Sequence, residues 1–320
     1  MEFKAFQAKP KAEIHVHLEG AIRPDRVVQW VAGQPGHPWH GCGARELVTK
    51  FKMASFPEFI EAFMTGYKLL DSRTRFQQIT EDLCAEFEEQ GVVYAEVLYS
   101  PGVQIQHWNR SLKDIHNGIE AGLRHFPNLP IRFILDTVLN LGPAFIARTL
   151  QAVLADRREF ISGFSVGGGV ADLDIRPFLP LFETAQRAGL YCVAHVGEVD
   201  SAENVRVLVE NTDVQRIAHG CAAAADPDAL QLLKRRGITV DVCPTSNRFT
   251  GASDGYDPHP AAVFLKHDIP ITINTDDPLY FGCHLFDEYQ AAIDTFGLDS
   301  SQVSQIMAHG LSFADRNAGA

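Results

Sequence analysis

The 320-residue sequence predicts an α/β fold, a (β/α)8 TIM barrel with extra helices, formed as one domain over residues 1–320. Eight short apolar runs, rich in Val, Ile and aromatic residues, alternate with amphipathic stretches along the chain. Such alternation favours parallel strands with covering helices, and the chain length fits a barrel with some insertion. A doubly wound open sheet is the alternative, but no GxGxxG turn follows the first apolar run to favour it.

The elements of this barrel can be placed along the chain. A helix before the second strand is indicated by apolar residues at 3.6-residue spacing, namely Phe76, Ile79, Leu83 and Phe87. Another helical pattern, residues 227–237, closes on Gly237 as a C-cap. Residues 31–46 are rich in Gly and Pro and predict a loop. The predicted strands are residues 12–17, 92–100, 131–139, 160–166, 190–196, 215–220, 238–244 and 270–276.

Composition restricts the partners. The apolar fraction of 46% and charged fraction of 21% are typical of a folded globular protein. The net charge is −12 with no block of Lys and Arg, which argues against nucleic acid as a partner and leaves a small neutral or weakly charged substrate. The six cysteines are scattered without a CxxC motif, as in a reducing compartment. With no signal-peptide core and no stretch long enough to span a membrane, we expect a cytoplasmic protein, monomeric or homodimeric, without a membrane partner.

Two histidines, His15 and His17, stand two residues apart in the first apolar run. In a strand such residues point to the same face, so the pair is either a wet strand face or half of a metal site. Further polar residues decide between these readings, because each follows a predicted strand and all carboxyl ends of barrel strands open on one mouth. The pattern therefore predicts an active site. These residues are His195, Glu198, His219, Asp276 and Asp277.

Three histidines and one carboxylate suit a metal that accepts nitrogen and oxygen donors, most often zinc. An open coordination position would hold water, whose pKa falls to about 7 on zinc. Taken singly, His195 could be a core histidine, and Asp276 with Asp277 could be a turn before Pro278. Together they favour one Zn²⁺ per chain. The predicted ligands are His15, His17, His195 and Asp276.

Residues beside the predicted metal indicate acid–base chemistry. Glu198 lies one short turn after His195, where a desolvated carboxyl with a raised pKa could act as general acid. His219 could orient or deprotonate the attacking water, or it could be a fourth histidine ligand. Asp277 could bond a polar edge of the substrate. The glycines in residues 164–170 would let a planar ligand approach the backbone, whereas a phosphate cradle lacks its Lys-Ser or Lys-Thr.

These motifs resemble the landmarks of the adenosine deaminase family, in the metal-dependent amidohydrolase superfamily. The likeness extends from about residue 10 to residue 296. The segments that carry it are PKAEIHVHLEGAIRPD, FPEFIEAF, EQGVVYAEVLYSP, AHVGE, RIAHG, CPTSN and NTDDP. The resemblance implies a (β/α)8 barrel with one zinc ion, which catalyses hydrolytic loss of ammonia from the six-position of a purine.

The resemblance also implies roles for single residues. It implies that the four predicted ligands bind zinc and that Glu198 protonates ring nitrogen N1. It also implies that His219 positions and deprotonates the attacking water. It further implies that Asp277 bonds N7, that the Gly168 backbone meets N3, and that Glu19 lies near the ribose. An apolar flap over the substrate would be formed by Phe56, Phe59 and Phe63.

Some positions depart from many adenosine deaminases. Glu19 replaces a common aspartate, Leu98 replaces an arginine, and Gly169 and Val170 replace an acidic pair. These changes leave the zinc chemistry intact and concern the sugar side. We predict a hydrolase acting on cyclic amidines, which converts adenosine to inosine and ammonia. Deamination of aminofutalosine or adenine is the alternative, and a non-catalytic purine-binding barrel is a remote one.

Overall fold

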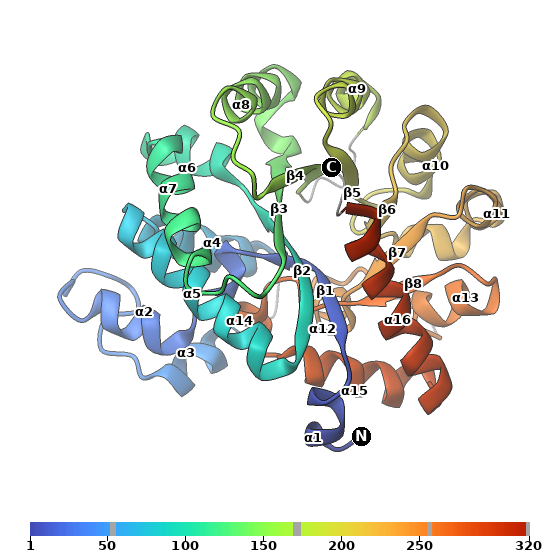
Figure 1. Ribbon diagram of the computed structural model, residues 1–320, viewed down its shortest axis with the longest axis horizontal. Coiled ribbons are helices and arrows are strands. Elements are labelled where there is room, and N and C mark those ends of the chain that lie inside the picture. Colours follow the sequence, from blue (N-terminus) through green and yellow to red (C-terminus); the bar gives the residue numbers. More distant parts are fainter. Residues whose placement is uncertain (52–55, 169–173, 255–257, 318–320) are drawn as a thin grey trace.

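The computed structural model describes residues 1–51, 56–168, 174–254 and 258–317. Its centre is one sheet of eight parallel strands, hydrogen-bonded in chain order from β1 to β8, with helices arranged around the outside (Figure 1). The predicted barrel and all eight predicted strands are confirmed. The strands are β1 Lys11–His17, β2 Val92–Tyr99, β3 Ile131–Val138, β4 Ile161–Gly167, β5 Tyr191–Val196, β6 Arg216–His219, β7 Thr239–Val242 and β8 Ile271–Ile273.

The helices mostly connect successive strands and cover the sheet. The longest insertion joins β1 to β2 and contains η1 Glu19–Ala21, α2 Pro24–Val31, α3 Ala44–Phe51, α4 Phe56–Leu69 and α5 Arg73–Gln90. The other helices are α1 Phe3–Gln7, α6 Pro101–Trp108, α7 Leu112–Leu123, η2 Leu139–Leu141, α8 Pro143–Ala155, η3 Arg176–Phe178, α9 Leu179–Arg187, α10 Ala202–Asn211, η4 Cys221–Ala225, α11 Pro227–Arg236, α12 Pro244–Phe249, α13 Pro260–Lys266, α14 Pro278–Phe281, α15 Leu285–Phe296 and α16 Ser300–Asn317.

Local signals in the sequence explain where these helices begin and end. The side chain of Asp226 accepts hydrogen bonds from the first backbone amides of α11, and Gly237 ends this helix with a left-handed φ of 64°. The four apolar residues predicted to form one helical face are all buried along α5. None of the helices within the described residues combines the length and apolarity needed to cross a membrane.

The barrel closes differently at its last seam. Between β8 and β1 the only backbone bridge within the described residues joins Val16 to Asp276. There the Asp276 amide donates to the His15 carbonyl at 3.1 Å, and the His17 amide donates to the Asp276 carbonyl at 2.8 Å. The seam that closes the barrel therefore also holds three of the predicted ligands next to one another.

The opposite end of the barrel is filled by a buried charged network. Arg216, at the start of β6, is 1% exposed and pairs with both Glu96 and Asp241. Its guanidinium also lies over the ring of Phe313 on α16. Because this end carries the amino termini of the strands, we interpret the network as structural.

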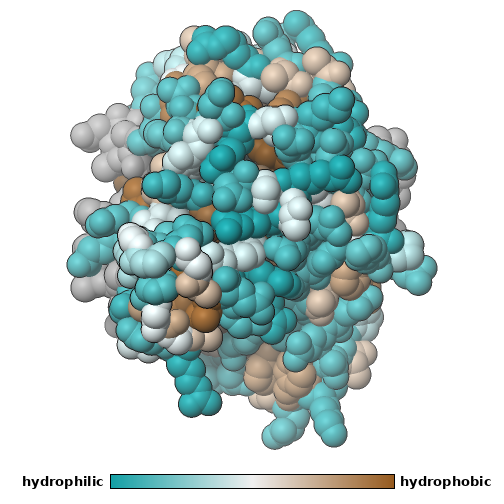
Figure 2. Space-filling view, turned by 90° about the vertical axis from the view of Figure 1, so that its left-hand side faces the viewer, coloured by the Kyte–Doolittle hydropathy of each residue, from teal (hydrophilic) through white to brown (hydrophobic). Residues whose placement is uncertain are grey.

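The face of the molecule on the α2 side is covered mainly by hydrophilic side chains, with small hydrophobic patches between them (Figure 2). Among the large hydrophobic residues that the structure describes, only three are exposed, namely Met1, Ile60 and Val93. Single exposed apolar side chains of this kind are normal at protein surfaces.

Candidate active site

The predicted ligands converge at the carboxyl end of the barrel. Neighbouring ring nitrogens lie close together: His195 Nε2 is 3.1 Å from His15 Nε2 and 3.2 Å from His17 Nε2. The Asp276 carboxylate completes the group, because its Oδ1 lies 3.4 Å from His15 Nε2 and 3.3 Å from His17 Nε2. Strands β1, β5 and β8, which are far apart in sequence, thus deliver four donor atoms to one point.

The spacing of these donors fits a tetrahedral zinc site. Ligand atoms about 2.0–2.1 Å from zinc in a tetrahedron lie roughly 3.3–3.4 Å from one another, close to the spacing observed here. Burial lowers the pKa of His15 to about 4 and that of His195 well below its usual range. Both rings are therefore neutral at pH 7 and present nitrogen lone pairs to the same point, an arrangement that a cation stabilises.

The electrostatic field at the site attracts positive charge. Burial opposes protonation of His17, but the carboxylates of Asp277 and Asp276 outweigh it and raise its pKa to about 10. Asp276 is itself held by the Ser246 hydroxyl, which donates to its Oδ2 at 2.6 Å. The same anionic surroundings that favour a proton on His17 would favour a divalent cation.

Two residues of this site adopt left-handed backbone conformations. His219, the last residue of β6, has φ of 63°, and Asp276 has φ of 64°. Only two other described residues besides glycine, Asn109 and Asp268, adopt positive φ. Conformations of this kind are disfavoured for such residues and persist where the surroundings hold them, often at functional sites.

A cavity of about 490 Å³ opens in front of the ligand cluster, in the size range of small-molecule sites. Four of the predicted substrate residues line it: Asp277, Gly168, Phe59 and Phe63. Glu19 is not among the lining residues, since it is 1% exposed and its Oε1 accepts the Ser100 amide at 2.9 Å. The side chain of Phe56, and residues Gly169 and Val170, lie outside the described residues.

Asp277 packs closely against the chain that follows β1. A Cβ atom on Gly20 would lie only 1.8 Å from Asp277 Oδ1 and 2.8 Å from Asp277 Cα, so only glycine leaves room for this carboxylate. The same Oδ1 is buried and has no hydrogen-bond partner within the described residues. Asp277 thus lines the cavity, while its Oδ1 is sealed from solvent against Gly20.

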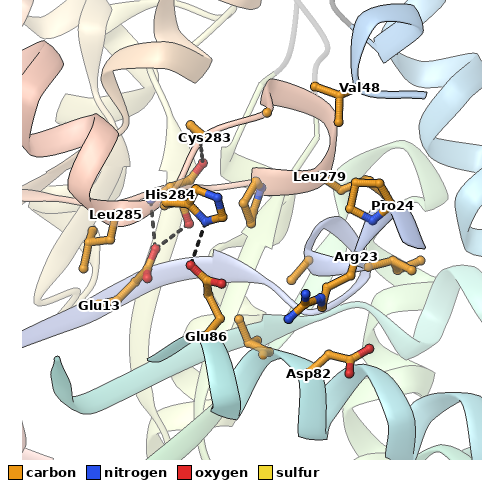
Figure 3. Close-up of a pocket in the computed structure, with 16 residues that line it drawn as sticks. Glu13, Arg23, Pro24, Val48, Asp82, Glu86, Leu279, Cys283, His284 and Leu285 are labelled. Carbon is orange, nitrogen blue, oxygen red and sulfur yellow. Dashed lines mark hydrogen bonds and ion pairs between the residues drawn. The ribbon is translucent and has the colours of Figure 1, made fainter. Parts of the chain in front are cut away.

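A second cavity, of about 320 Å³, lies beside the segment that follows β8. Figure 3 shows Glu13 in its wall, with the Glu86–His284 pair nearby. Glu13 accepts hydrogen bonds from the amide and hydroxyl of Thr275, the residue before Asp276. None of the clustered ligands is among the described residues that line this cavity, so we regard Glu13 as a support for the end of β8.

The sequence model of the adenosine deaminase family matches residues 10–318, nearly the whole chain. The chain belongs to the adenosine deaminase family. It is 30% identical over 316 residues to an aminodeoxyfutalosine deaminase of Streptomyces coelicolor, covering 96% of this chain and 80% of that one. It is 28% identical to an adenine deaminase of Stutzerimonas stutzeri, covering 94% and 96%. Its fold also resembles that of a zinc-bound amidohydrolase from Burkholderia ambifaria, with a TM-score of 0.86, 22% identity and coverage of 98% and 89%.

Two titratable residues of this adenosine deaminase family member lie beside the ligand cluster. Glu198 lines the cavity, and its Oε2 is 3.7 Å from His219 Nε2. Burial, reinforced by the charge of Asp276, raises the pKa of Glu198 to about 7. Burial lowers the pKa of His219 to about 4, so this ring is neutral at pH 7. At the same pH part of the Glu198 carboxyl groups still carry a proton.

Two supporting residues were not predicted from the sequence. The side-chain amide of Asn247 lies 2.9 Å from His219 Nδ1 and holds the ring with Nε2 towards the cluster. Ser246, its neighbour on α12, donates to Asp276. Both belong to the CPTSN segment that carried the family resemblance, and this segment was the available signal for them.

Proposed function

We propose that this chain is a zinc-dependent aminohydrolase that removes the six-amino group of a purine. We further propose aminodeoxyfutalosine as its substrate, or else free adenine, in place of adenosine. The observation that carries this proposal is the cluster of four ligand atoms beside Glu198 at the wall of one cavity. The relatives named above, an aminodeoxyfutalosine deaminase and an adenine deaminase, support the choice of substrate.

The residues of the cluster support zinc as the metal. His15, His17, His195 and Asp276 supply three imidazole nitrogens and one carboxylate, a donor set that suits zinc once the His17 proton is displaced. Zinc is also present in the amidohydrolase of similar fold. When bound, zinc would act as a Lewis acid and lower the pKa of water to about 7, which makes a nucleophile available at neutral pH.

The chain's own residues would perform the proton transfers. Protonated Glu198 would donate to ring nitrogen N1, which makes C6 more electrophilic. His219 would orient the attacking water and take its proton at Nε2. This transfer requires that the Asn247 amide oxygen, which has no other hydrogen-bond partner within the described residues, accepts from Nδ1–H of His219. A C6–O bond forms and the C6–N bond breaks. One proton of the water leaves with the amino group as ammonia, and the other passes from the new C6–OH to Glu198, which leaves an oxo group at C6 and a proton on N1. Asp277 and the Gly168 backbone would bind polar edges of the ring from the cavity wall.

The shape of the cavity supports a nucleoside over a free base. Its lining extends from the ligand cluster to Met64 on α4, His107 on α6 and Leu141 on η2. These residues come from helices on the β2 and β3 side of the mouth, so the cavity has room for a substituent on N9. Adenine alone would leave this part of the cavity filled by water.

Ultraviolet absorbance tests the activity, because the purine spectrum changes when the six-amino group becomes oxo. We expect zinc-loaded protein to deaminate aminodeoxyfutalosine, and we expect a higher kcat/KM for it than for adenine or adenosine. The same protein treated with a chelator is the control and should be inactive. The proposed aminohydrolase activity would be refuted if the spectrum stayed unchanged with all these compounds and with methylthioadenosine.

The pKa of Glu198 predicts the pH dependence of turnover. Because burial raises this pKa to about 7, the proton donor is present below pH 7 and is lost as the pH rises above it. We expect kcat/KM to fall above about pH 7, approaching tenfold per pH unit. A pH–rate profile of the zinc-loaded protein measures this decline. A profile that stays level up to pH 9 would contradict the role of Glu198 as general acid.

A further inference from the structure

We propose that Asp136 is a positioning residue whose carboxylate fixes the His195 ring so that Nε2 faces the metal. The inference rests on the metal site of the proposed function. Asp136 lies on β3 and is 3% exposed. Its Oδ1 is 3.8 Å from His195 Nδ1, on the side of the ring opposite the ligand cluster.

The hydrogen bonds of Asp136 leave one oxygen for this role. Its Oδ2 accepts from the Ser100 hydroxyl at 2.8 Å. Its Oδ1 is buried and has no hydrogen-bond partner within the described residues. When Nε2 of an imidazole binds a metal, Nδ1 carries the proton and usually donates it to a carboxylate, carbonyl or water. Asp136 Oδ1 is the charged, unsatisfied acceptor that faces this proton.

Other groups around His195 Nδ1 do not replace the carboxylate. The Ser165 hydroxyl lies 3.3 Å away and, because it donates to the Val166 carbonyl at 3.4 Å, can still accept from Nδ1–H; it is neutral, however, and does not supply the negative charge of Asp136. A Cβ atom on Gly167 would lie 2.9 Å from Nδ1, so this side of the ring is closely packed. A charge-assisted hydrogen bond to Asp136 would be roughly twice as strong as a neutral one to Ser165.

The surroundings of Asp136 also argue against direct substrate binding. Although the residue borders the cavity, one of its oxygens is bonded to Ser100 and the other is sealed from solvent. Ser100 is itself anchored, because its amide donates to Glu19 at 2.9 Å. This chain of contacts joins the ends of β1, β2 and β3 to His195 on β5. Asp136 is therefore held rigidly, as a positioning residue requires.

Zinc affinity of the metal-stripped protein, measured by competition with a chromophoric chelator, tests the proposal without any substrate. We expect Asp136→Ala to lower zinc affinity about 10–100-fold, and Asp136→Asn to lower it less, because the amide can still accept a hydrogen bond. The visible spectrum of the cobalt(II)-substituted variants should change, since it reports ligand geometry. Asp294→Asn is the matched control, because the substitution is chemically identical and Asp294 is exposed on α15; its zinc affinity should equal that of wild type.

The outcomes separate this proposal from the proposed function. The positioning role would be overturned if both Asp136 variants kept the zinc affinity and the cobalt spectrum of wild type. A raised KM for the purine in the same variants would then make Asp136 a substrate contact. Failure of the wild-type protein to bind zinc would instead refute the metal site itself. Thermal unfolding of the metal-free variants serves as a check on folding, and Asp136→Asn retains the test if Asp136→Ala does not fold.

Discussion

Replacement of Glu198 by glutamine is expected to lower kcat about 10²–10⁴-fold, the usual contribution of a positioned general acid. Glutamine keeps the size of the side chain and its place beside His219 but cannot deliver the proton that N1 requires. The zinc content should stay at the wild-type level. Within the described residues, the groups of side chains spaced to hold a metal ion do not include Glu198.

Steady-state kinetics and metal analysis of the same preparation test this expectation. Glu210→Gln is a suitable control, because Glu210 is exposed on α10 and the substitution is chemically identical. The control should have wild-type kcat. Loss of zinc from Glu198→Gln would make Glu198 a ligand, and retention of wild-type kcat would exclude it as the proton donor.

The fold and the position of the candidate site could be predicted because both depend on short-range patterns. Each strand of a parallel barrel is buried on both faces, so it shows as an apolar run. Polar residues such as His195 and His219 that end these runs must then meet at one mouth. One rule of topology was therefore enough to predict that His195 lies near His15 and His17, which are about 180 positions away in the sequence. The Nε2 atom of His195 is indeed 3.1 Å from that of His15 and 3.2 Å from that of His17.

Other features depend on contacts that no local pattern encodes. The last strand was predicted as residues 270–276, but β8 ends at Ile273. Beyond it, side chains replace the ladder: Asn274 Oδ1 accepts the Ile14 amide at 2.9 Å, and Glu13 accepts the Thr275 amide. The contact of Asp136 with His195 likewise joins two strands that are not adjacent in the sheet.

Replacement of His17 by alanine is the second change for which we expect a large effect, namely loss of zinc and of the stability that zinc confers. A ligand present at 100 times its Kd stabilises the folded state by about 2.7 kcal/mol, and this contribution disappears with the binding. His17 suits the test better than His15, because its side chain is 12% exposed and that of His15 is 1% exposed. Truncation of His17 thus removes less buried packing.

The measurement that isolates the metal is the change in Tm caused by a chelator. In wild type the chelator should lower Tm, because metal binding and folding are coupled. In His17→Ala this decrease should be much smaller, and the zinc content after dialysis should be low. His267→Ala, which truncates an exposed histidine after α13, should behave as wild type. Equal zinc content in His17→Ala and wild type would show that the imidazole of His17 is no ligand, because the loss of one of four ligands would weaken zinc binding.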